Sequence, residues 1–360
     1  MSYEPSSASH KPRAMDVRTA LKEGMNRLRE GRVPSHTLAA ELLLMDVLGC
    51  ERAWLYSRHE DVLDPGKVER YLHLVARRIA GVPTQYLTGR QEFWGLEFEV
   101  TPDVLIPRPE TEHVIEVALA RLGQGQDSSW TGAGMTEDRA EGSRTGTRAA
   151  LDAAMHGAGL RIADVGTGSG CLAVALAHEL PEAVVVATDI SSAALAVARR
   201  NAVRNGVAQR IQFVQCNLLG ALESGRLPPL SKGRSELPPS TNVGARHAVP
   251  FRPPAMLPRF HVIVSNPPYV GRSEAGLLPR EVREHEPAQA LFAGEQGCEI
   301  YALLIGQADK LLGSGGTLVL EIGYNALDRV RPLFDSYAWT NVGVTNDLAG
   351  IPRVIAAEKL

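Results

Sequence analysis

The sequence lacks long hydrophobic runs and has few cysteines. No apolar stretch in its 360 residues is as long as a membrane-spanning helix, so we expect no membrane partner. The four cysteines are scattered, without a Cys-x-x-Cys pair or the spacing of metal ligands. This predicts free thiols, no metal site and a reducing, cytoplasmic compartment. The first 14 residues are polar and contain no hydrophobic segment typical of a secretory signal.

An excess of positive charge is also missing. Lysine and arginine total 38 against 41 acidic residues, and the formal net charge of −3 gives no overall positive field to hold a polyanion. This argues against DNA or RNA as the main substrate, although a local basic patch remains open. The hydrophobic content of 44% is sufficient for a large core, and the length suggests two domains or one domain with an appendage.

The N-terminal part has the pattern of a small helical bundle. Apolar residues recur at helical spacing from residue 16 to about residue 80. Ser35 is a suitable N-cap, Gly49 is a stop signal and Asp64-Pro65 is a further helix start. The period then shifts toward two, so residues 86–98 are expected to form a β-hairpin. This part contains no cluster that indicates chemistry.

Two stretches with a different composition interrupt the rest of the chain. They lack apolar periodicity and are rich in small, polar and charged residues or proline, which predicts disordered surface insertions at 123–157 and 227–258. The expected organisation is a disordered tail, a helical domain, a hairpin linker and a larger α/β domain, at residues 1–15, 16–82, 83–104 and 105–360.

The larger domain shows a strand, a glycine-rich turn and a helix in succession. An apolar run ends at residue 165, and Gly166, Thr167, Gly168, Ser169 and Gly170 form the turn. This is the first unit of a Rossmann-like sheet, in which the glycines allow a ligand to approach the backbone closely. Further strands are expected at 184–189, 211–214, 260–265 and 317–322.

Two acidic residues indicate the kind of cofactor. Asp189 ends the second strand about 20 residues after the glycines, where such folds bind ribose hydroxyls. Asp164, inside the first strand, would repel a pyrophosphate and attract a sulfonium or an amino group. Together with the glycine spacing, which differs from the dinucleotide fingerprint, this favours S-adenosylmethionine over NAD. A structural role for Asp164, as a cap for the amides of the turn, remains open.

The stretch Asn266-Pro267-Pro268-Tyr269 follows an apolar strand. Proline cannot donate to a ladder, so the strand ends here and Asn266 lies at its carboxyl end, where open α/β sheets bind ligands. Asn266 offers a side-chain carbonyl, Pro267 a backbone carbonyl without an N–H, and Tyr269 an aromatic face. These groups suit a planar NH2 group, which needs two acceptors. A rigid turn with an Asx contact is the alternative interpretation.

In combination, these motifs resemble the release-factor glutamine methyltransferases, the PrmC/HemK family. The resemblance covers nearly all of the chain apart from the tail and the two insertions. Asn-Pro-Pro-Tyr alone marks a broad group of amino-group methyltransferases, and other stretches are more specific. The stretches that complete the match are Pro107-Arg108-Pro109-Glu110-Thr111-Glu112, Glu286-Pro287 with Ala290-Leu291, and Glu321-Ile322-Gly323.

The resemblance implies an α/β fold: a Rossmann-like S-adenosylmethionine-dependent methyltransferase domain with a small N-terminal helical bundle joined by a β-hairpin. The implied activity is methylation of the side-chain amide nitrogen of the glutamine in the Gly-Gly-Gln motif of class I peptide-chain release factors, without direct contact to nucleic acid. The implied cofactor-binding residues are Asp164, Gly166 to Gly170, Asp189, Asn217, Leu218 and Asn266. The implied catalytic residues are Asn266, Pro267 and Tyr269, with Pro268 added for substrate binding.

The chain departs from the family pattern at two positions. Asn217 stands where the family usually has aspartate, which leaves an uncharged partner for the adenine amino group. Tyr324-Asn325-Ala326 follows Glu-Ile-Gly, where glutamine is often found.

Three other functions share parts of this pattern. An amino methyltransferase acting on the exocyclic NH2 of DNA adenine or rRNA guanine would suit the same loop after base extrusion, but the chain lacks a basic excess. An NAD-dependent oxidoreductase is opposed by the glycine spacing and by Asp164. A non-catalytic binding module is opposed by the intact acceptor loop at Asn266.

Overall fold

Seven strands form one mixed sheet in the order β5-β4-β3-β6-β7-β9-β8. Strands β5, β4, β3, β6 and β7 are parallel, whereas β9 runs antiparallel to β7 and β8 antiparallel to β9. The strands are β3 (Arg161–Val165), β4 (Val184–Asp189), β5 (Ile211–Gln215), β6 (Phe260–Ser265), β7 (Leu312–Glu321), β8 (Trp339–Asn346) and β9 (Pro352–Lys359). This topology confirms the predicted Rossmann-like α/β fold.

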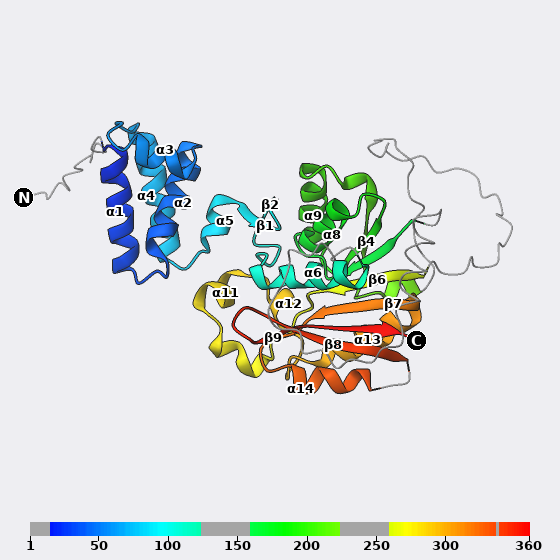
Figure 1. Ribbon diagram of the computed structural model, residues 1–360. Helices are drawn as coiled ribbons and strands as arrows, with labels where there is room; N and C mark the ends of the chain where they lie inside the picture. The colour runs from blue at the N-terminus through cyan, green and yellow to red at the C-terminus, as the bar shows by residue number, and fades with distance from the viewer. Residues whose placement is uncertain (1–14, 124–158, 224–258, 336–337) are drawn as a thin grey trace, which may run out of the picture. The chain divides into compact units, whose positions relative to one another are not determined.

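The computed structural model describes residues 15–123, 159–223, 259–335 and 338–360 (Figure 1). The predicted tail and the insertions 123–157 and 227–258 therefore lie outside the described residues, apart from Met15 and Gly123. The chain forms two units: residues up to Arg90 with 278–285, and residues 91–277 with 286–360. None of the described helices combines the length and the apolar character needed to cross a membrane.

The N-terminal unit is helical, as predicted. Its elements are α1 (Val17–Glu30), α2 (His36–Leu48), α3 (Arg52–Ser57), α4 (Pro65–Ile79), α5 (Thr84–Thr88) and α11 (Arg280–His285). Asp64 caps α4 by accepting from the backbone amides of Gly66 and Lys67, and Gly49 ends α2 at φ 68°. Ser35 occupies the N-cap position of α2 without a side-chain capping bond, because its backbone is left-handed (φ 51°).

Two expectations about the boundary between the units were wrong. Residues 84–88 form helix α5 between Pro83 and the left-handed Gly89, so the hairpin is limited to β1 (Arg90–Phe93) and β2 (Leu96–Glu99). Residues 278–285, predicted within the larger domain, belong to the N-terminal unit, where Glu281 forms an ion pair with the buried Arg78. Apolar periodicity could not show this because the contact joins distant parts of the chain.

In the second unit, helices flank the sheet (Figure 1). The strands predicted at 184–189, 211–214 and 260–265 agree with the structure to within about one residue, whereas the strand predicted at 317–322 begins earlier, at Leu312. Strands β8 and β9 were not predicted. The helical elements are η1 (Pro109–Thr111), α6 (Glu112–Arg121), α8 (Cys171–Glu179), α9 (Ser192–Arg204), η2 (Ala208–Arg210), α10 (Gly220–Glu223), η3 (Arg272–Leu277), α12 (Ala288–Leu291), α13 (Glu299–Leu311), α14 (Leu327–Val330) and η4 (Arg331–Phe334).

Gly170 controls how closely the glycine turn approaches α9. Its φ is +83°, and a Cβ added there would lie 3.0 Å from Cβ and 3.2 Å from Cα of Ala198. Gly206 also has a positive φ, of +71°, but a Cβ there would have no atom within 4 Å. A substitution at Gly206 therefore introduces backbone strain alone, whereas one at Gly170 introduces both strain and a steric clash.

We predict that Gly170→Ala lowers the free energy of unfolding by about 2–3 kcal/mol, because backbone strain and overpacking add. Gly206→Ala, with strain alone, should lose only about 1 kcal/mol. Urea unfolding of both variants measures the difference. Equal losses would show that the approach to Ala198 is relieved by a shift of α9.

Candidate active site

The carboxyl ends of β3 and β6 lie side by side. The two strands pair in parallel with Val165 opposite Ser265, and the Ser265 hydroxyl donates to the Val165 carbonyl at 2.7 Å. From β3 the chain continues to β4 and β5 on one side, while β6 and β7 lie on the other. The sheet order reverses here, which is where open α/β sheets bind their ligands. The glycine turn and the Asn266 loop leave the sheet at this point.

A cavity of about 300 Å³ opens at this edge, a size suited to a small ligand. Most of the predicted site residues line it. They are Gly166, Thr167, Gly168, Ser169, Asp189, Asn217, Leu218, Asn266 and Pro268. Four predicted residues, Asp164, Gly170, Pro267 and Tyr269, are not among its lining residues. Lining residues without an individual role in the sequence analysis include Asp103, Arg108, Thr111, Ile190 and Phe292.

The glycine turn presents open backbone to the cavity. Gly166 and Gly168 have positive φ, and a Cβ on Gly166 would have no neighbour within 4 Å. The backbone N–H groups of Gly166 and Thr167 both donate to the Thr188 carbonyl at 2.9 Å, which ties the turn to β4. The turn is thus rigid while its ligand-facing side stays uncovered.

Asp189 joins the turn to the next loop. Its Oδ2 accepts from the Gly168 N–H at 2.9 Å and its Oδ1 from the Ser191 N–H at 2.8 Å. Burial raises the pKa of this carboxyl, and the backbone hydrogen bonds oppose the rise. Each oxygen retains acceptor capacity, so the carboxylate can receive hydroxyl donors from the cavity.

Asp164 serves the fold of the turn, which supports the structural interpretation left open above. Its Oδ2 accepts from the Thr167 hydroxyl at 2.6 Å and from the Ala173 N–H of α8 at 3.1 Å. The residue is 1% exposed, and burial raises its pKa to about 7. Its other oxygen, Oδ1, is buried without a hydrogen-bond partner among the described residues. The carboxylate thus joins the turn to α8, and Asp164 is not among the residues that line the cavity.

Tyr269 is not among the residues that line the cavity, so its predicted role as an aromatic platform there stays a prediction. A Cβ on Gly323 would meet the Tyr269 ring at 2.8 Å, which shows how closely the ring packs on that glycine. Burial raises the Tyr269 pKa, and its hydroxyl is hydrogen-bonded to Glu321. Pro267 is buried, whereas Tyr269 is half-buried. Only Asn266 and Pro268 of this loop reach the cavity wall.

The segment from residue 103 to residue 111 forms another part of the wall. Arg108 forms an ion pair with the buried Glu286, which also accepts from the Ile106 N–H at 3.4 Å. Thr111 reaches the cavity, whereas Glu110 and Glu112 are not among its lining residues. Glu112 instead accepts from the Trp94 N–H at 2.8 Å. The Pro107–Glu112 and Glu286-Pro287 stretches of the resemblance therefore contact each other.

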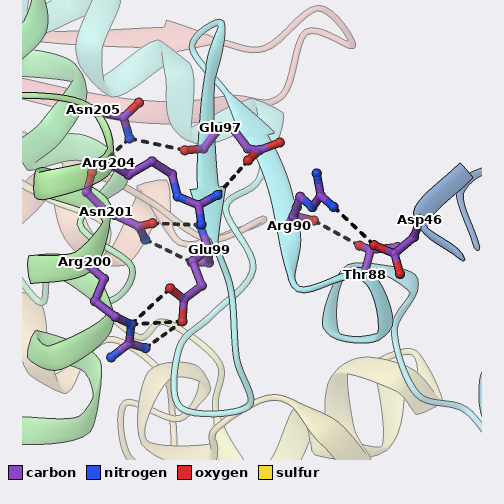
Figure 2. A network of polar contacts seen from close by, with 9 residues as sticks. All are labelled: Asp46, Thr88, Arg90, Glu97, Glu99, Arg200, Asn201, Arg204 and Asn205. Carbon is purple, nitrogen blue, oxygen red and sulfur yellow. Dashed lines mark hydrogen bonds and ion pairs between the residues drawn. The ribbon is translucent and has the colours of Figure 1, made fainter. Parts of the chain in front are cut away.

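The hairpin that leads into this wall is fixed on α9 (Figure 2). Arg200 bonds to both carboxylate oxygens of Glu99, and Arg204 pairs with Glu97 at 2.6 Å. Asn201 exchanges two hydrogen bonds with the Glu99 backbone, at 2.7 and 2.9 Å. Its Nδ2 also donates to the Ser169 carbonyl at 2.9 Å. One fully buried amide thus joins the hairpin to the glycine turn.

Within the N-terminal unit, Figure 2 also shows contacts around Arg90. The Arg90 guanidinium lies 3.4 Å from Asp46 of α2, and the Thr88 hydroxyl donates to the Arg90 carbonyl at 3.5 Å. These contacts are long and belong to partly exposed groups, so they contribute little to stability.

The side chains around the cavity fit S-adenosylmethionine. The uncovered turn leaves room for a methionine portion, and the Asp189 carboxylate suits a ribose diol. Asn217 and Leu218 offer an amide and an apolar surface for a base. Cys171 also lines the cavity, but burial raises its pKa to about 12, so the thiol stays protonated and is a poor nucleophile.

Comparisons with known proteins show which proteins this chain is similar to. The family model "PrmC N-terminal domain" matches residues 19–89, and "Methyltransferase small domain" matches residues 143–230. The release factor glutamine methyltransferase of Koribacter versatilis is 37% identical over 345 residues, which cover 96% of this chain and 99% of that protein. The proteins of the same name from Moorella thermoacetica and Nitratidesulfovibrio vulgaris are 37% and 32% identical, covering 95% and 99% of this chain and 98% of each relative.

We predict that Asn201→Ala lowers the free energy of unfolding by about 2–3 kcal/mol, because one buried and two partly buried backbone groups lose their partner. It should also speed hydrogen exchange in the hairpin and weaken cofactor binding. Asn205→Ala is the matched control, since within the described part of the chain the Asn205 side chain bonds only to the carbonyls of Glu97 and Asn201, at 3.2 and 3.0 Å. Hydrogen exchange in residues 95–108 that is unchanged in Asn201→Ala would contradict the coupling.

A second prediction concerns pH. The Asp164 pKa is about 7 in the folded protein against an ordinary value of 3.8 for aspartate, so between these values the folded state keeps a proton that the unfolded chain has lost. The stability that protonated Asp164 contributes is therefore fully present below the pKa of the unfolded state, and it is lost as pH rises through the pKa of the folded state. Thermal unfolding without cofactor should show a smaller fall from about pH 5.5 to about pH 8 in Asp164→Asn than in the wild type. Parallel pH profiles would contradict this.

Proposed function

Because the chain belongs to the family of release factor glutamine methyltransferases, we propose that it methylates the glutamine side-chain nitrogen in the Gly-Gly-Gln motif of class I peptide-chain release factors. The donor is S-adenosylmethionine, and the proposed site of action is the cytoplasm, where release factors work. The observation that carries the proposal is the position of Asn266, which lines the same cavity as the glycine turn and Asp189. An amide-recognising group and a cofactor pocket thereby share one wall.

The reaction requires control over a weak nucleophile. The lone pair of an amide nitrogen is delocalised into its carbonyl, so the nitrogen must be polarised and directed before it can attack. When bound, S-adenosylmethionine supplies an electrophilic methyl group. In our proposal, the Asn266 side-chain oxygen accepts one hydrogen of the substrate NH2. It fixes the direction of the nitrogen and stabilises the positive charge that develops there. The Pro267 carbonyl was predicted as the second acceptor, but Pro267 is buried and does not line the cavity, so its part in the reaction stays a prediction.

The remaining residues have supporting roles. Asp189 would hold the ribose hydroxyls, the turn from Gly166 to Gly170 the methionine portion, and Asn217 with Leu218 the adenine. No dedicated base is needed, because the methylated nitrogen is acidic and can lose its proton to water. Pro268 forms the wall next to Asn266. Tyr269 supports the loop through its contact with Gly323.

Replacing Asn266 by Ala should lower kcat by at least roughly 100-fold, because one acceptor and its orienting effect are lost. Cofactor binding should be weaker but still measurable by calorimetry. The assay follows labelled methyl transfer to purified release factor, and a release factor with Ala in place of the target glutamine must stay unlabelled. Asn346→Ala, at the exposed end of β8, is the control variant.

Duplex DNA and ribosomal RNA serve as competing acceptors in the same assay. Methylation of nucleic acid in preference to release factor would refute the proposed substrate. Undiminished activity of Asn266→Ala would refute the proposed mechanism while leaving the substrate in place. The two parts of the proposal are thus tested separately.

A further inference from the structure

A short chain of hydrogen bonds runs from Asn266 into the protein interior. The Asn266 Nδ2 donates to the Thr111 hydroxyl oxygen at 3.0 Å, and the Thr111 hydroxyl donates to Oε2 of Glu321 at 2.7 Å. Thr111 and Glu321 are each 2% exposed. Three segments far apart in the sequence, namely η1, the end of β6 and the end of β7, therefore meet at one side-chain amide.

The chemistry of the three groups gives this chain one direction. An ionised carboxylate can only accept hydrogen bonds, so the single proton of the Thr111 hydroxyl is directed to Glu321. The oxygen of Thr111 is then an acceptor for Asn266, and only the NH2 end of the Asn266 amide can meet it. Within the described residues no hydrogen bond reaches the Asn266 Oδ1. The oxygen end thus stays available at the cavity.

We propose that Thr111 and Glu321 are positioning residues that hold the Asn266 amide with its oxygen, rather than its NH2, available to the substrate. This deepens the proposed function and rests on it. A substrate NH2 group needs acceptors, so an Asn266 amide rotated by half a turn would place donor against donor. Both orientations have nearly the same shape, and packing alone therefore cannot select between them. The hydrogen bonds from Asn266 through Thr111 to Glu321 favour one of the two orientations of the amide.

The surroundings of Glu321 make this chain sensitive to protonation. Tyr269 is hydrogen-bonded to the carboxyl and Arg353 exerts a favourable charge on it, whereas Glu110 exerts an unfavourable one. The Tyr301 hydroxyl donates to the Glu321 backbone carbonyl at 3.1 Å, and the Cys171 thiol is also within electrostatic range. Burial outweighs the favourable contacts and raises the Glu321 pKa to about 7.

Protonation would reverse the direction of the chain. A neutral Glu321 can donate to the Thr111 oxygen, which frees the Thr111 hydroxyl to donate to Asn266. The Asn266 amide could then turn its oxygen inward and its NH2 toward the substrate. Turnover should therefore fall as pH decreases through the titration of Glu321.

Three variants test the proposal. Thr111→Val keeps the shape but removes both hydrogen bonds, and kcat should fall by about 10- to 100-fold because the amide is no longer oriented. Thr111→Ser keeps the hydroxyl and should retain kcat within about threefold. Glu321→Gln should lower kcat and remove the acid limb of the pH profile. Thermal unfolding confirms that each variant is folded, and calorimetry gives its cofactor affinity.

A substrate-free measurement separates this inference from the proposed function. The side-chain NH2 resonance of Asn266, assigned by its loss in Asn266→Ala, should shift with pH in the ¹⁵N-labelled wild type and stay constant in Glu321→Gln. If the wild type methylates no release factor, the proposed function fails while this readout still stands. The positioning role is refuted if the resonance titrates equally in both proteins. It is also refuted if folded Thr111→Val keeps full kcat, or if Thr111→Ser loses as much as Thr111→Val.

Discussion

The parallel pairing of β3 with β6 is the constraint on which the rest of the site depends. The Ser265 hydroxyl bonded to the Val165 carbonyl sets the register at the ends of both strands. Two loops with different tasks, one suited to the cofactor and one to an amide, therefore leave the sheet as neighbours. Neither loop could do its work with its strand displaced by a residue, since a slip of one residue turns each side chain to the opposite face.

Two buried carboxyl groups lie within an otherwise apolar core, one in β3 and one at the end of β7. Asp164 and Glu321 both lie in the interior, and both have a pKa raised to about 7 by burial. Burying such groups costs stability unless hydrogen bonds offset the loss of water. Each therefore accepts from a threonine hydroxyl, Asp164 from Thr167 and Glu321 from Thr111. These buried carboxyl groups lower the stability of the fold, but their hydrogen bonds orient the loops at the site.

Local patterns predicted the parts of the fold that local physics decides. Strand–turn–helix succession, the glycine turn and the helix start at Asp64-Pro65, where Asp64 caps α4, all follow from neighbours in sequence. The cofactor side of the cavity was predictable for the same reason. The packing of Tyr269 was not predictable, because its ring contacts Gly323, which is distant in the sequence and follows strand β7. Thr111 could not be singled out in the sequence, where it is one polar residue of the Pro107–Glu112 stretch. Its hydrogen bonds to Asn266 and Glu321 are what indicate a positioning role.

The interleaving of the chain has a consequence for dissecting the protein. Because residues 278–285 complete the N-terminal unit, the backbone passes between the units three times, and no single cut yields two intact pieces. A fragment ending at Arg90 would lack Glu281 and leave the buried Arg78 without its carboxylate, and the complementary fragment would carry α11 without the surface that it covers. The N-terminal unit therefore cannot be removed by cutting the chain once. Recombination between relatives would have to exchange the segment up to Arg90 and residues 278–285 together.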